Sequence, residues 1–457
     1  MSRAERLPRS ILACYAFPAF ALAMPTIPVY VYLPSYYADT VGLGLTATGA
    51  VLLAARLLDV VTDPMVGVLS DRHRSRWGRR RPWILIGALL AALGLVQLFQ
   101  PASAAGPAYL LAWAMVLYVG WTLVAVPYAA WGAELSDDYH ERSRITGARE
   151  AAMIIGILAA AAVPAVVAAA GGSERDGLGA VAWLAILIGA PAMALLLWRV
   201  PERDPGAAEA VSGASFAKKN RLRALVEVAK NRPFLRLLSA WFVNGLANGF
   251  PAVLFPLFLQ HGLEAGPVAR GGLIMAYFLA GVMAIPLWLR LSRRHGKHKT
   301  WCAAMIIACA AFIWAPFLAP GDIGLFAVIC VVTGAALGAD LALPPAMQAD
   351  VVDYDTLRTG QQRAGLFFAL WSMATKLALA CAVGIAFPLL DLFGFDPGGA
   401  NTAGALLALS LIYAVFPTIL KGAAIALIWR HPIDARRQRI IRRRLIGREA
   451  RRLPASV

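Results

Sequence analysis

Charged residues are scarce in this chain of 457 residues, and their scarcity excludes an ordinary soluble fold. Asp, Glu, Lys and Arg together make up 15% of the sequence, and hydrophobic residues make up 60%. Soluble domains usually carry about 25% charged and about 45–50% apolar residues. The mean hydropathy of +0.65 points the same way. We therefore expect an integral membrane protein.

Cysteine and histidine are too few and too scattered for several kinds of chemistry. The cysteines lie in apolar segments without a Cys-x-x-Cys spacing, which argues against disulfides and metal ligation. The histidines fall in loops or at the ends of apolar segments, which argues against a histidine proton relay inside a membrane. The first apolar segment is too long for a cleavable signal peptide and is expected to be a true transmembrane helix. The cysteines are Cys14, Cys302, Cys309, Cys330 and Cys381.

Apolar segments recur along the whole chain, each long enough to cross a bilayer. A hydrocarbon core of about 30 Å needs about 20 residues of helix. Prolines inside these segments suit membrane helices, where neighbouring helices satisfy the freed backbone groups. The pattern predicts an all-α membrane protein with twelve transmembrane helices, over 11–38, 45–70, 83–102, 107–135, 146–170, 179–199, 235–262, 269–291, 300–319, 324–349, 363–390 and 403–429.

The chain divides near its middle into two sets of six spans. Residues 200–234 form the only long polar stretch between spans. A weak repeat relates the basic loop after the second span to the loop after the eighth, around His73 and His295. We expect a six-helix half over 1–199, a cytoplasmic linker over 200–234, a second half over 235–430 and a basic cytoplasmic tail over 431–457.

The net charge of +17 gives an orientation. Arginines and lysines crowd the loops after the second, fourth and eighth spans, whereas the opposite loops carry almost none beyond Arg175. By the positive-inside rule both termini are cytoplasmic, in the inner (plasma) membrane of the cell. The basic linker and tail can also rest on anionic lipid headgroups. No nucleic-acid recognition motif accompanies these charges, so nucleic acid is not an expected partner.

Two acidic residues stand out against this apolar background. Asp59 and Asp63 lie four residues apart in the second span, so a helix places them on one face. A charged residue at the bilayer centre costs at least about 2.5–3.5 kcal/mol and usually faces a bundle interior or a water-filled cavity. The pair is expected to converge on one cation or to share a proton. The alternative is a structural ion pair between Arg56 and Asp59, with Asp63 satisfied by a neighbouring helix.

Two longer motifs resemble those of a known family. Asp59-Val-Val-Thr-Asp63-Pro-Met-Val-Gly67 runs on to Asp71 and to Trp77-Gly78-Arg-Arg-Arg81-Pro82. Ala349-Asp-Val-Val-Asp-Tyr-Asp-Thr-Leu-Arg-Thr-Gly360 precedes Lys376 in the eleventh span. The chain is similar over nearly all its spans to the glycoside-pentoside-hexuronide:cation symporters, of which melibiose permease is the best-known member. The resemblance implies the major facilitator fold, with solute and cation sites near midplane between the halves.

The resemblance also assigns roles to individual residues. Asp59 and Asp63 would bind the coupling cation, with oxygen from Thr62 and Thr122; such hard ligands suit sodium, and the carboxylates can instead carry a proton. Arg149 would line the solute cavity, and Lys376 would lie near the aspartates. Further residues at cavity-facing positions are Tyr30, Tyr32 and Ser372.

The departures from the family pattern bear on the solute. Ala23, Ala125 and Ala129 stand where melibiose permease holds sugar with two aspartates and a tryptophan, so melibiose recognition is not expected. Because Arg149 and Lys376 remain, an anionic solute such as a hexuronide is favoured. A lysophospholipid or other amphiphile is the alternative within the same wider family.

Several residues keep two interpretations. Lys376 is either a counter-ion for the aspartates in the absence of the cation or a solute contact. Asp340, an acid in the tenth span, pairs with Lys376 or Arg149, or faces a small polar pocket. Trp371 either packs or forms a stacking surface for the solute, and packing is favoured.

A further set of charges is expected to open and close the cytoplasmic side. In one interpretation, Asp71 and the arginines of its loop only set the orientation of the chain in the membrane. In the other, Asp71 pairs with an arginine of the same loop, with Arg142 or with Arg144, and this ion pair locks the outward-open state. Acids and an arginine at the end of the tenth span are expected to form gate or inter-half ion pairs. The latter residues are Asp350, Asp353, Asp355 and Arg358.

Other functional classes fit less well. No nucleophile or supporting shell accompanies Asp59 and Asp63, so an enzyme is not expected. A channel is not expected either, because two sets of six spans joined by a long central loop are typical of carriers. We therefore expect a cation-coupled carrier that works as a monomer in the lipid bilayer, with no cofactor beyond the coupling ion, Na⁺ or H⁺.

Overall fold

The chain folds into long apolar helices where the hydropathy pattern predicts them. The computed structural model describes residues 7–72, 75–101, 105–135, 139–202, 228, 230–360 and 364–452. Within these residues, twelve helical segments are long and apolar enough to cross a membrane, and each overlaps one predicted span. The protein is therefore a multi-pass, all-helical membrane protein.

Each half contributes six of these segments. The N-terminal half contains α1 (Arg9–Ala23) with η1 (Pro28–Tyr32) and α2 (Leu33–Ala38), then α3 (Leu45–Arg72), α4 (Arg81–Phe99), α5 (Pro107–Glu134), α6 (Tyr139–Ala169) and α7 (Glu174–Arg199). The C-terminal half contains α10 (Arg232–Leu257) with η2 (Phe258–Gly262), α11 (Pro267–His295), α12 (Lys297–Phe312) with η3 (Ala315–Phe317), α13 (Ile323–Thr359), α14 (Ala364–Leu392), and α15 (Ala403–Ser410) with η4 (Leu411–Val415) and α16 (Phe416–Ile428). A last helix, α17 (Ala435–Arg452), follows in the basic tail.

Prolines accompany three irregular spans, the first, seventh and twelfth. Each contains a π-helical turn next to a proline: Pro28 begins η1, Pro256 precedes η2, and Pro417 follows η4. Proline removes a backbone donor and disturbs the regular ladder, so a wider turn absorbs the misfit. These spans bend without leaving the bundle.

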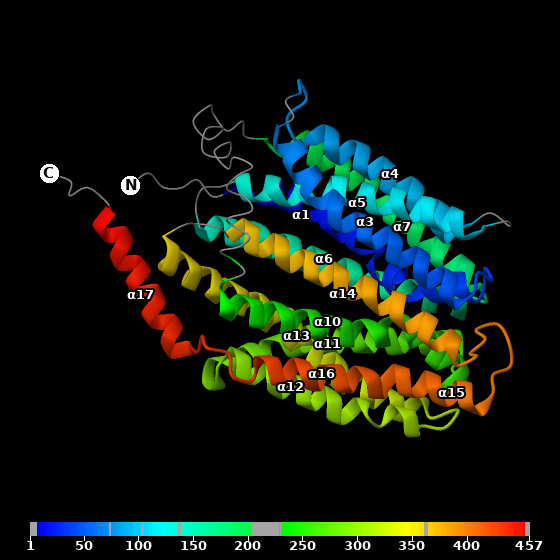
Figure 1. The fold of residues 1–457 in the computed structure, drawn as a ribbon. Coiled ribbons are helices and arrows are strands. Elements are labelled where there is room, and N and C mark those ends of the chain that lie inside the picture. Colours follow the sequence, from blue (N-terminus) through cyan, green and yellow to red (C-terminus); the bar gives the residue numbers. More distant parts are fainter. Residues whose placement is uncertain are drawn as a thin grey trace.

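The two halves lie side by side with their helices roughly parallel (Figure 1). Helix α3 packs against α14, α6 against α11, and η1 with α2 against α10. The start of α1 and the helix α17 lie at one end of the bundle, where α17 lies against α13. We name this the basic end, where Arg144, Lys297 and Arg358 lie, and we name the other the far end, where Asp39 and Gln260 lie.

The halves are in close contact at the far end. A Cβ atom on Gly384 of α14 would lie 2.6 Å from the Leu53 side chain of α3, and one on Gly49 would lie 3.0 Å from the Val383 carbonyl oxygen. Glycine is required at such positions because its missing side chain lets two helices approach. Across the same interface, the Thr46 hydroxyl donates to Asp391, 2.5 Å away.

The tenth span is longer than predicted. Helix α13 continues ten residues beyond the expected end at 349 and stops at Gly360, whose φ of +71° ends the helix. The hydropathy falls at Asp350 because the helix leaves the apolar layer, not because the helix ends. The acids at this point therefore lie within a helix: Asp350 and Asp353 are half-buried, and Asp355 is buried at 1% exposure.

Candidate functional site

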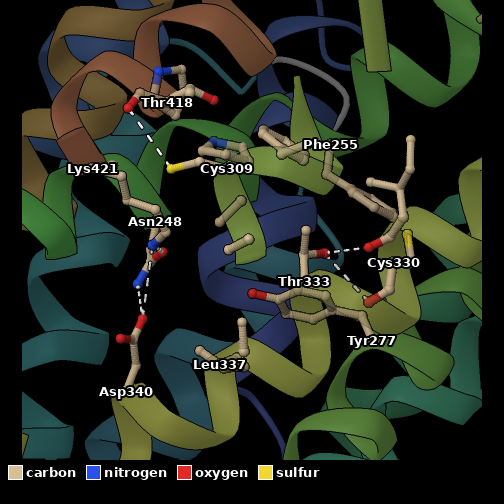
Figure 2. A pocket seen from close by; sticks show the side chains of 18 of the residues that line it. Asn248, Phe255, Tyr277, Cys309, Cys330, Thr333, Leu337, Asp340, Thr418 and Lys421 are labelled. Atoms are coloured by element: carbon tan, nitrogen blue, oxygen red, sulfur yellow. Dashed lines mark hydrogen bonds and ion pairs between the residues drawn. The ribbon is translucent and has the colours of Figure 1, made fainter. Parts of the chain in front are cut away.

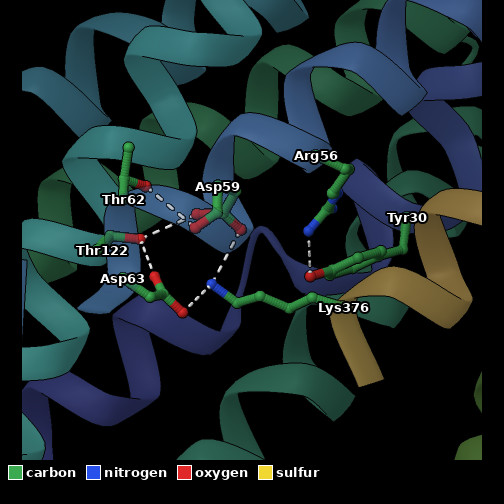
Figure 3. A network of polar contacts seen from close by, with 7 residues as sticks. All are labelled: Tyr30, Arg56, Asp59, Thr62, Asp63, Thr122 and Lys376. Atoms are coloured by element: carbon green, nitrogen blue, oxygen red, sulfur yellow. Dashed lines mark hydrogen bonds and ion pairs between the residues drawn. The ribbon is translucent and has the colours of Figure 1, made fainter. Parts of the chain in front are cut away.

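Two carboxylates and one hydroxyl meet in the middle of the N-terminal half (Figure 3). Asp59 and Asp63 project from the same face of α3, and Thr122 reaches them from α5. The Thr122 hydroxyl oxygen lies 3.0 Å from Oδ1 of Asp59 and 2.6 Å from Oδ1 of Asp63. Asp59 and Thr122 are buried, at 5% and 3% exposure. Such a set of oxygens can hold a small cation or a proton.

Lys376 completes this cluster from the other half of the molecule. Its ammonium nitrogen lies 2.9 Å from Oδ2 of Asp59 and 2.5 Å from Oδ2 of Asp63. The lysine comes from α14, so the ion pairs bridge the two halves. The structure thus brings Asp59, Asp63, Thr122 and Lys376 together, as the family resemblance implied.

The charges of this cluster do not cancel. With both carboxylates ionised, two negative charges face the one positive charge of Lys376. The side chains of Lys376 and Asp63 are each 23% exposed, whereas that of Asp59 is 5% exposed. One negative charge is left over in a partly solvated site, which favours a second cation.

Arg56 lies beside the cluster but is engaged by aromatic residues. Its guanidinium donates to the Tyr30 hydroxyl at 2.7 Å and lies 4.1 Å from the ring centre of Tyr30 and 4.2 Å from that of Tyr118. The alternative interpretation paired Arg56 with Asp59. In the structure the ion-pair partner of Asp59 is Lys376. Cation–π contacts help to hold a buried arginine, here 5% exposed.

Thr62 differs from the other expected cation ligands. Its hydroxyl donates to the backbone carbonyl of Asp59 at 3.1 Å, which is a local bond within α3. The side chain is half-buried next to the carboxylates. In this arrangement Thr62 supports the helix that carries the carboxylates.

The expected solute residues are spread around this centre. Ser372 lies one turn before Lys376 on the same face of α14 and is exposed. Tyr32 is buried, at 7% exposure. Arg149 pairs with the adjacent Glu150, with 2.6 Å between nitrogen and oxygen. Trp371 stacks on Trp241, with ring centres 4.7 Å apart, which favours its packing interpretation.

The charges expected to open and close the basic end make their described contacts within one half. Arg144 donates to Glu141 and to the Leu7 carbonyl, all in the N-terminal half. Lys297 binds Asp350 at 2.6 Å, Gln438 binds Asp353, and Arg358 lies 3.9 Å from Asp355, all in the C-terminal half. The role of these residues as a gate or as inter-half ion pairs stays a prediction, because in this arrangement the halves meet at the far end. The side chains of Asp71 and Arg142 lie outside the described residues.

Asp340 belongs to a separate polar cluster. It pairs with neither Lys376 nor Arg149 but lies 3.9 Å from Lys421 of α16 and faces a pocket, the third of the alternatives. Sequence reasoning missed Lys421, although a lone lysine in an apolar span is the same signal that singled out Asp59. It also missed Asn244 and Asn248, because amides in membrane helices are too common to single out.

Comparison with known families and proteins gives a consistent picture. A family model described as MFS/sugar transport protein matches residues 14–435. The chain is 24% identical to an isoprimeverose transporter of Lactiplantibacillus pentosus, covering 91% of this chain and 87% of the relative. It is 23% identical to a glucuronide carrier protein homolog of Escherichia coli, covering 91% and 89%. It is also 23% identical to the sodium-dependent lysophosphatidylcholine symporter 1-A of Danio rerio, covering 93% and 86%.

A solved structure shares the fold. The crystal structure of the nucleoside transporter NupG matches with a TM-score of 0.65 at 14% identity, and covers 91% of this chain and 98% of that one. At this identity the match concerns architecture alone. It agrees with two six-helix halves.

Proposed function

Since the chain belongs to the MFS/sugar transport family, we propose that it is a secondary active symporter that couples the movement of Na⁺ or H⁺ to that of a sugar or glycoside. Asp59 and Asp63 hold the coupling cation, with oxygen from Thr122 and Thr62. The observation that carries this proposal is the Lys376 ammonium between the two carboxylates, at the place where a cation would sit. The solute binds between the halves and crosses by alternating access.

Lys376 links cation binding to the solute. A cation that binds Asp59 and Asp63 competes with the ammonium for the same oxygens, so it releases Lys376 towards the cavity. The released charge is then available to a solute. Because Lys376 belongs to α14 and the aspartates belong to α3, the exchange also breaks an ion pair between the halves. Cation, solute and the movement of the halves are thereby coupled.

The orientation follows from the charges. The basic end carries the arginines and lysines of the loops, so it faces the cytoplasm with both termini. The protein acts as a monomer in the plasma membrane. Alternating access then requires the far end, which is closed here, to open towards the outside.

The proposed solute is an anionic glycoside such as a hexuronide. Lys376 at the site and Arg149, which the resemblance assigned to the cavity, are both paired with acids in this structure. Arg56 is engaged by Tyr30 and Tyr118. An anion therefore gains a partner only after the coupling cation has freed Lys376. The glucuronide carrier homolog supports this class, whereas the lysophosphatidylcholine symporter of zebrafish supports an amphiphile as the second candidate.

Solute binding should depend on both solute charge and the coupling cation. We expect glucuronides to bind at least about tenfold more tightly than melibiose, equivalent to about 1.4 kcal/mol, and only when Na⁺ or low pH supplies the cation. Calorimetric titration of the purified protein measures this, with a lysophospholipid as a third solute. In Lys376→Gln the preference for the anion should disappear. Tight melibiose binding without binding of uronides or lysolipids would overturn the solute assignment.

The far-end contact should respond to pH through Asp39. Gln260 of the other half donates to the Asp39 carboxylate at 3.3 Å. Burial raises the pKa of Asp39 above its usual value and outweighs the hydrogen bond from Gln260 and the charges of His261 and Arg270, which lower it, while Asp396 reinforces the rise. A raised pKa means that the closed far end binds the proton more tightly than an open one. Closure is therefore favoured at low pH and weakens as pH rises through the raised pKa.

Spin labels on Ala170→Cys and Val268→Cys, in a chain without its native cysteines, would report the distance between the halves at the far end. We expect the distance to lengthen as pH rises, and the Asp39→Asn variant to lose most of this response. A pH response of unchanged size in Asp39→Asn would show that another group controls closure.

A further inference from the structure

A large apolar cavity lies inside the C-terminal half, away from the cation site. It encloses about 940 Å³, its open mouth included, between α10, α11, α12, α13 and α16 (Figure 2). Its walls are mainly aromatic and aliphatic. Val31 of η1 also lines it, so an occupant would touch both halves. The aromatic lining residues are Phe255, Tyr277, Phe278, Phe312, Phe326 and Tyr413.

One wall of the cavity carries a cluster of hydrogen-bonded polar side chains. Asp340, Lys421 and Asn248 line the cavity, and Asn244 and Trp301 lie behind them, fully buried. Oδ2 of Asp340 accepts from Asn248 at 2.9 Å and from Asn244 at 3.1 Å, and its Oδ1 accepts from Trp301 at 2.5 Å. Three N–H groups thus hold the carboxylate in place.

Lys421 has one N–H group that makes no described hydrogen bond. The Lys421 ammonium donates to the amide oxygens of Asn248 at 2.6 Å and of Asn244 at 2.9 Å. Its distance to Asp340, 3.9 Å, is too long for a hydrogen bond. Of the three N–H groups of an ammonium, two are used by these bonds. The third is available to an acceptor in the cavity.

Charge decides what that acceptor can be. Asp340 compensates the positive charge of Lys421, so the wall offers a hydrogen-bond donor without a net charge. A free anion would add an uncompensated charge to an apolar space, which is costly. A hydroxyl or carbonyl oxygen adds none. The wall therefore suits an uncharged group that accepts a hydrogen bond.

Stability alone does not account for these charges. Replacing a buried ion pair with apolar residues is often neutral or stabilising, so a buried pair is weak evidence of a structural role. Ionisable groups in membrane spans usually serve binding or transport. The proposed cation site is formed by α3, α5 and α14. Asp340 and Lys421 therefore have no role in the proposed cation coupling.

We propose that this cavity is a second ligand site, which binds an uncharged, mainly apolar ring compound through a hydroxyl or carbonyl oxygen on Lys421 and Asn248. The ring system lies among the aromatic walls, and the oxygen points to the polar cluster. This site goes beyond the proposed symport and does not depend on it. Its residues come from helices that do not contribute to the cation cluster.

The native cysteines give a test that needs no substitution. Cys309 lines the cavity, whereas Cys14 and Cys381 are equally half-buried but do not line it. The protein in lipid nanodiscs is alkylated with N-ethylmaleimide, and the labelling rate of each cysteine is measured by peptide mass spectrometry. The added compounds are 2-naphthol, which is neutral with one hydroxyl, and naphthalene-2-sulfonate, which has the same rings and a negative charge.

We expect 2-naphthol to slow the labelling of Cys309 at least fivefold at saturation and to leave Cys14 and Cys381 within twofold. The sulfonate should leave all three within twofold. Equal slowing at the three cysteines would mean partition into the membrane and would overturn the proposal. So would an unprotected Cys309, or protection by the sulfonate as strong as that by the naphthol.

Two substitutions in the same helix distinguish binding in the cavity from binding to the outer surface of the helix. Ala308 lines the cavity, and Ile306, two residues earlier on α12, is 47% exposed on the outside. Ala308→Phe should weaken the apparent affinity for 2-naphthol, measured by protection of Cys309, at least fivefold. Ile306→Phe should leave it within twofold. Equal effects of the two would count against the cavity.

A double variant tests the polar cluster. Asp340→Asn with Lys421→Gln removes both charges together and leaves no single charge buried without a partner. We expect it to weaken 2-naphthol binding at least fivefold. Binding that is unchanged in the double variant would remove Lys421 from the site. If a variant fails to fold, the comparison of naphthol with sulfonate in the unmodified chain still decides the proposal.

Discussion

Gradient-driven solute accumulation should be abolished in Asp59→Asn and in Asp63→Asn. Each substitution keeps the shape of the side chain and a partner for Thr122 but removes one of the two charges that hold the cation. Without that charge, a gradient of the cation can no longer drive the solute. We expect a fall of at least about tenfold, to the level of vesicles that lack the protein.

The measurement is uptake of a labelled glucuronide into proteoliposomes with an imposed sodium gradient and, separately, an imposed pH gradient. The gradient that drives uptake by the unmodified chain identifies the coupling ion. Asp322→Asn is the matched control, because this far-end acid precedes α13 and accepts from the Ala319 N–H in the preceding loop, and asparagine can do the same. Full concentrative uptake by both site variants, with normal insertion, would refute the cation site.

Lys376→Met should destabilise the protein, and a second substitution should reverse most of the loss. Removing one partner of a buried ion pair costs about 3–5 kcal/mol, because the other charge stays buried without compensation. Partial exposure of Lys376 and Asp63 reduces this cost, so we expect about half of it. In Lys376→Met the Asp59 carboxylate, at 5% exposure, loses its partner. The double variant Asp63→Asn, Lys376→Met removes one negative charge as well.

Thermal unfolding of the purified protein, followed by loss of monodisperse material, measures the effect without added Na⁺. We expect the midpoint to fall by several degrees in Lys376→Met and to recover by at least half in the double variant. Added Na⁺ should also restore the single variant if sodium occupies the place of the ammonium. The matched control is Lys297→Met, whose ion pair with Asp350 is equally short but more exposed, with Lys297 37% exposed. A double variant less stable than the single one would contradict the shared site.

Particular residues show which features of the site can be predicted from the sequence. Asp59 and Asp63 could be placed on one helix face because helical periodicity is a local property, and the cost of burying them could be estimated without a structure. The family resemblance then implied that Lys376 lies near them. Asp340 could not be assigned from sequence, because its partner Lys421 lies 81 positions away in a helix whose rotation no local pattern fixes. The ion pair between Arg56 and Asp59 was the alternative interpretation, and sequence could not replace it with the aromatic contacts because Tyr30 and Tyr118 come from other spans.

The sequence by itself determined the membrane class, the twelve spans, the division into two halves and the pair of carboxylates on α3. These follow from hydropathy, helix length and charge, which act over neighbouring residues. Only the tertiary structure decided that Lys376 bridges the halves, that the described contacts of Arg144, Lys297 and Arg358 stay within one half, and that the C-terminal half contains a cavity with a neutral polar wall. Those features depend on how helices rotate and pack against each other, and packing joins residues that no local pattern connects.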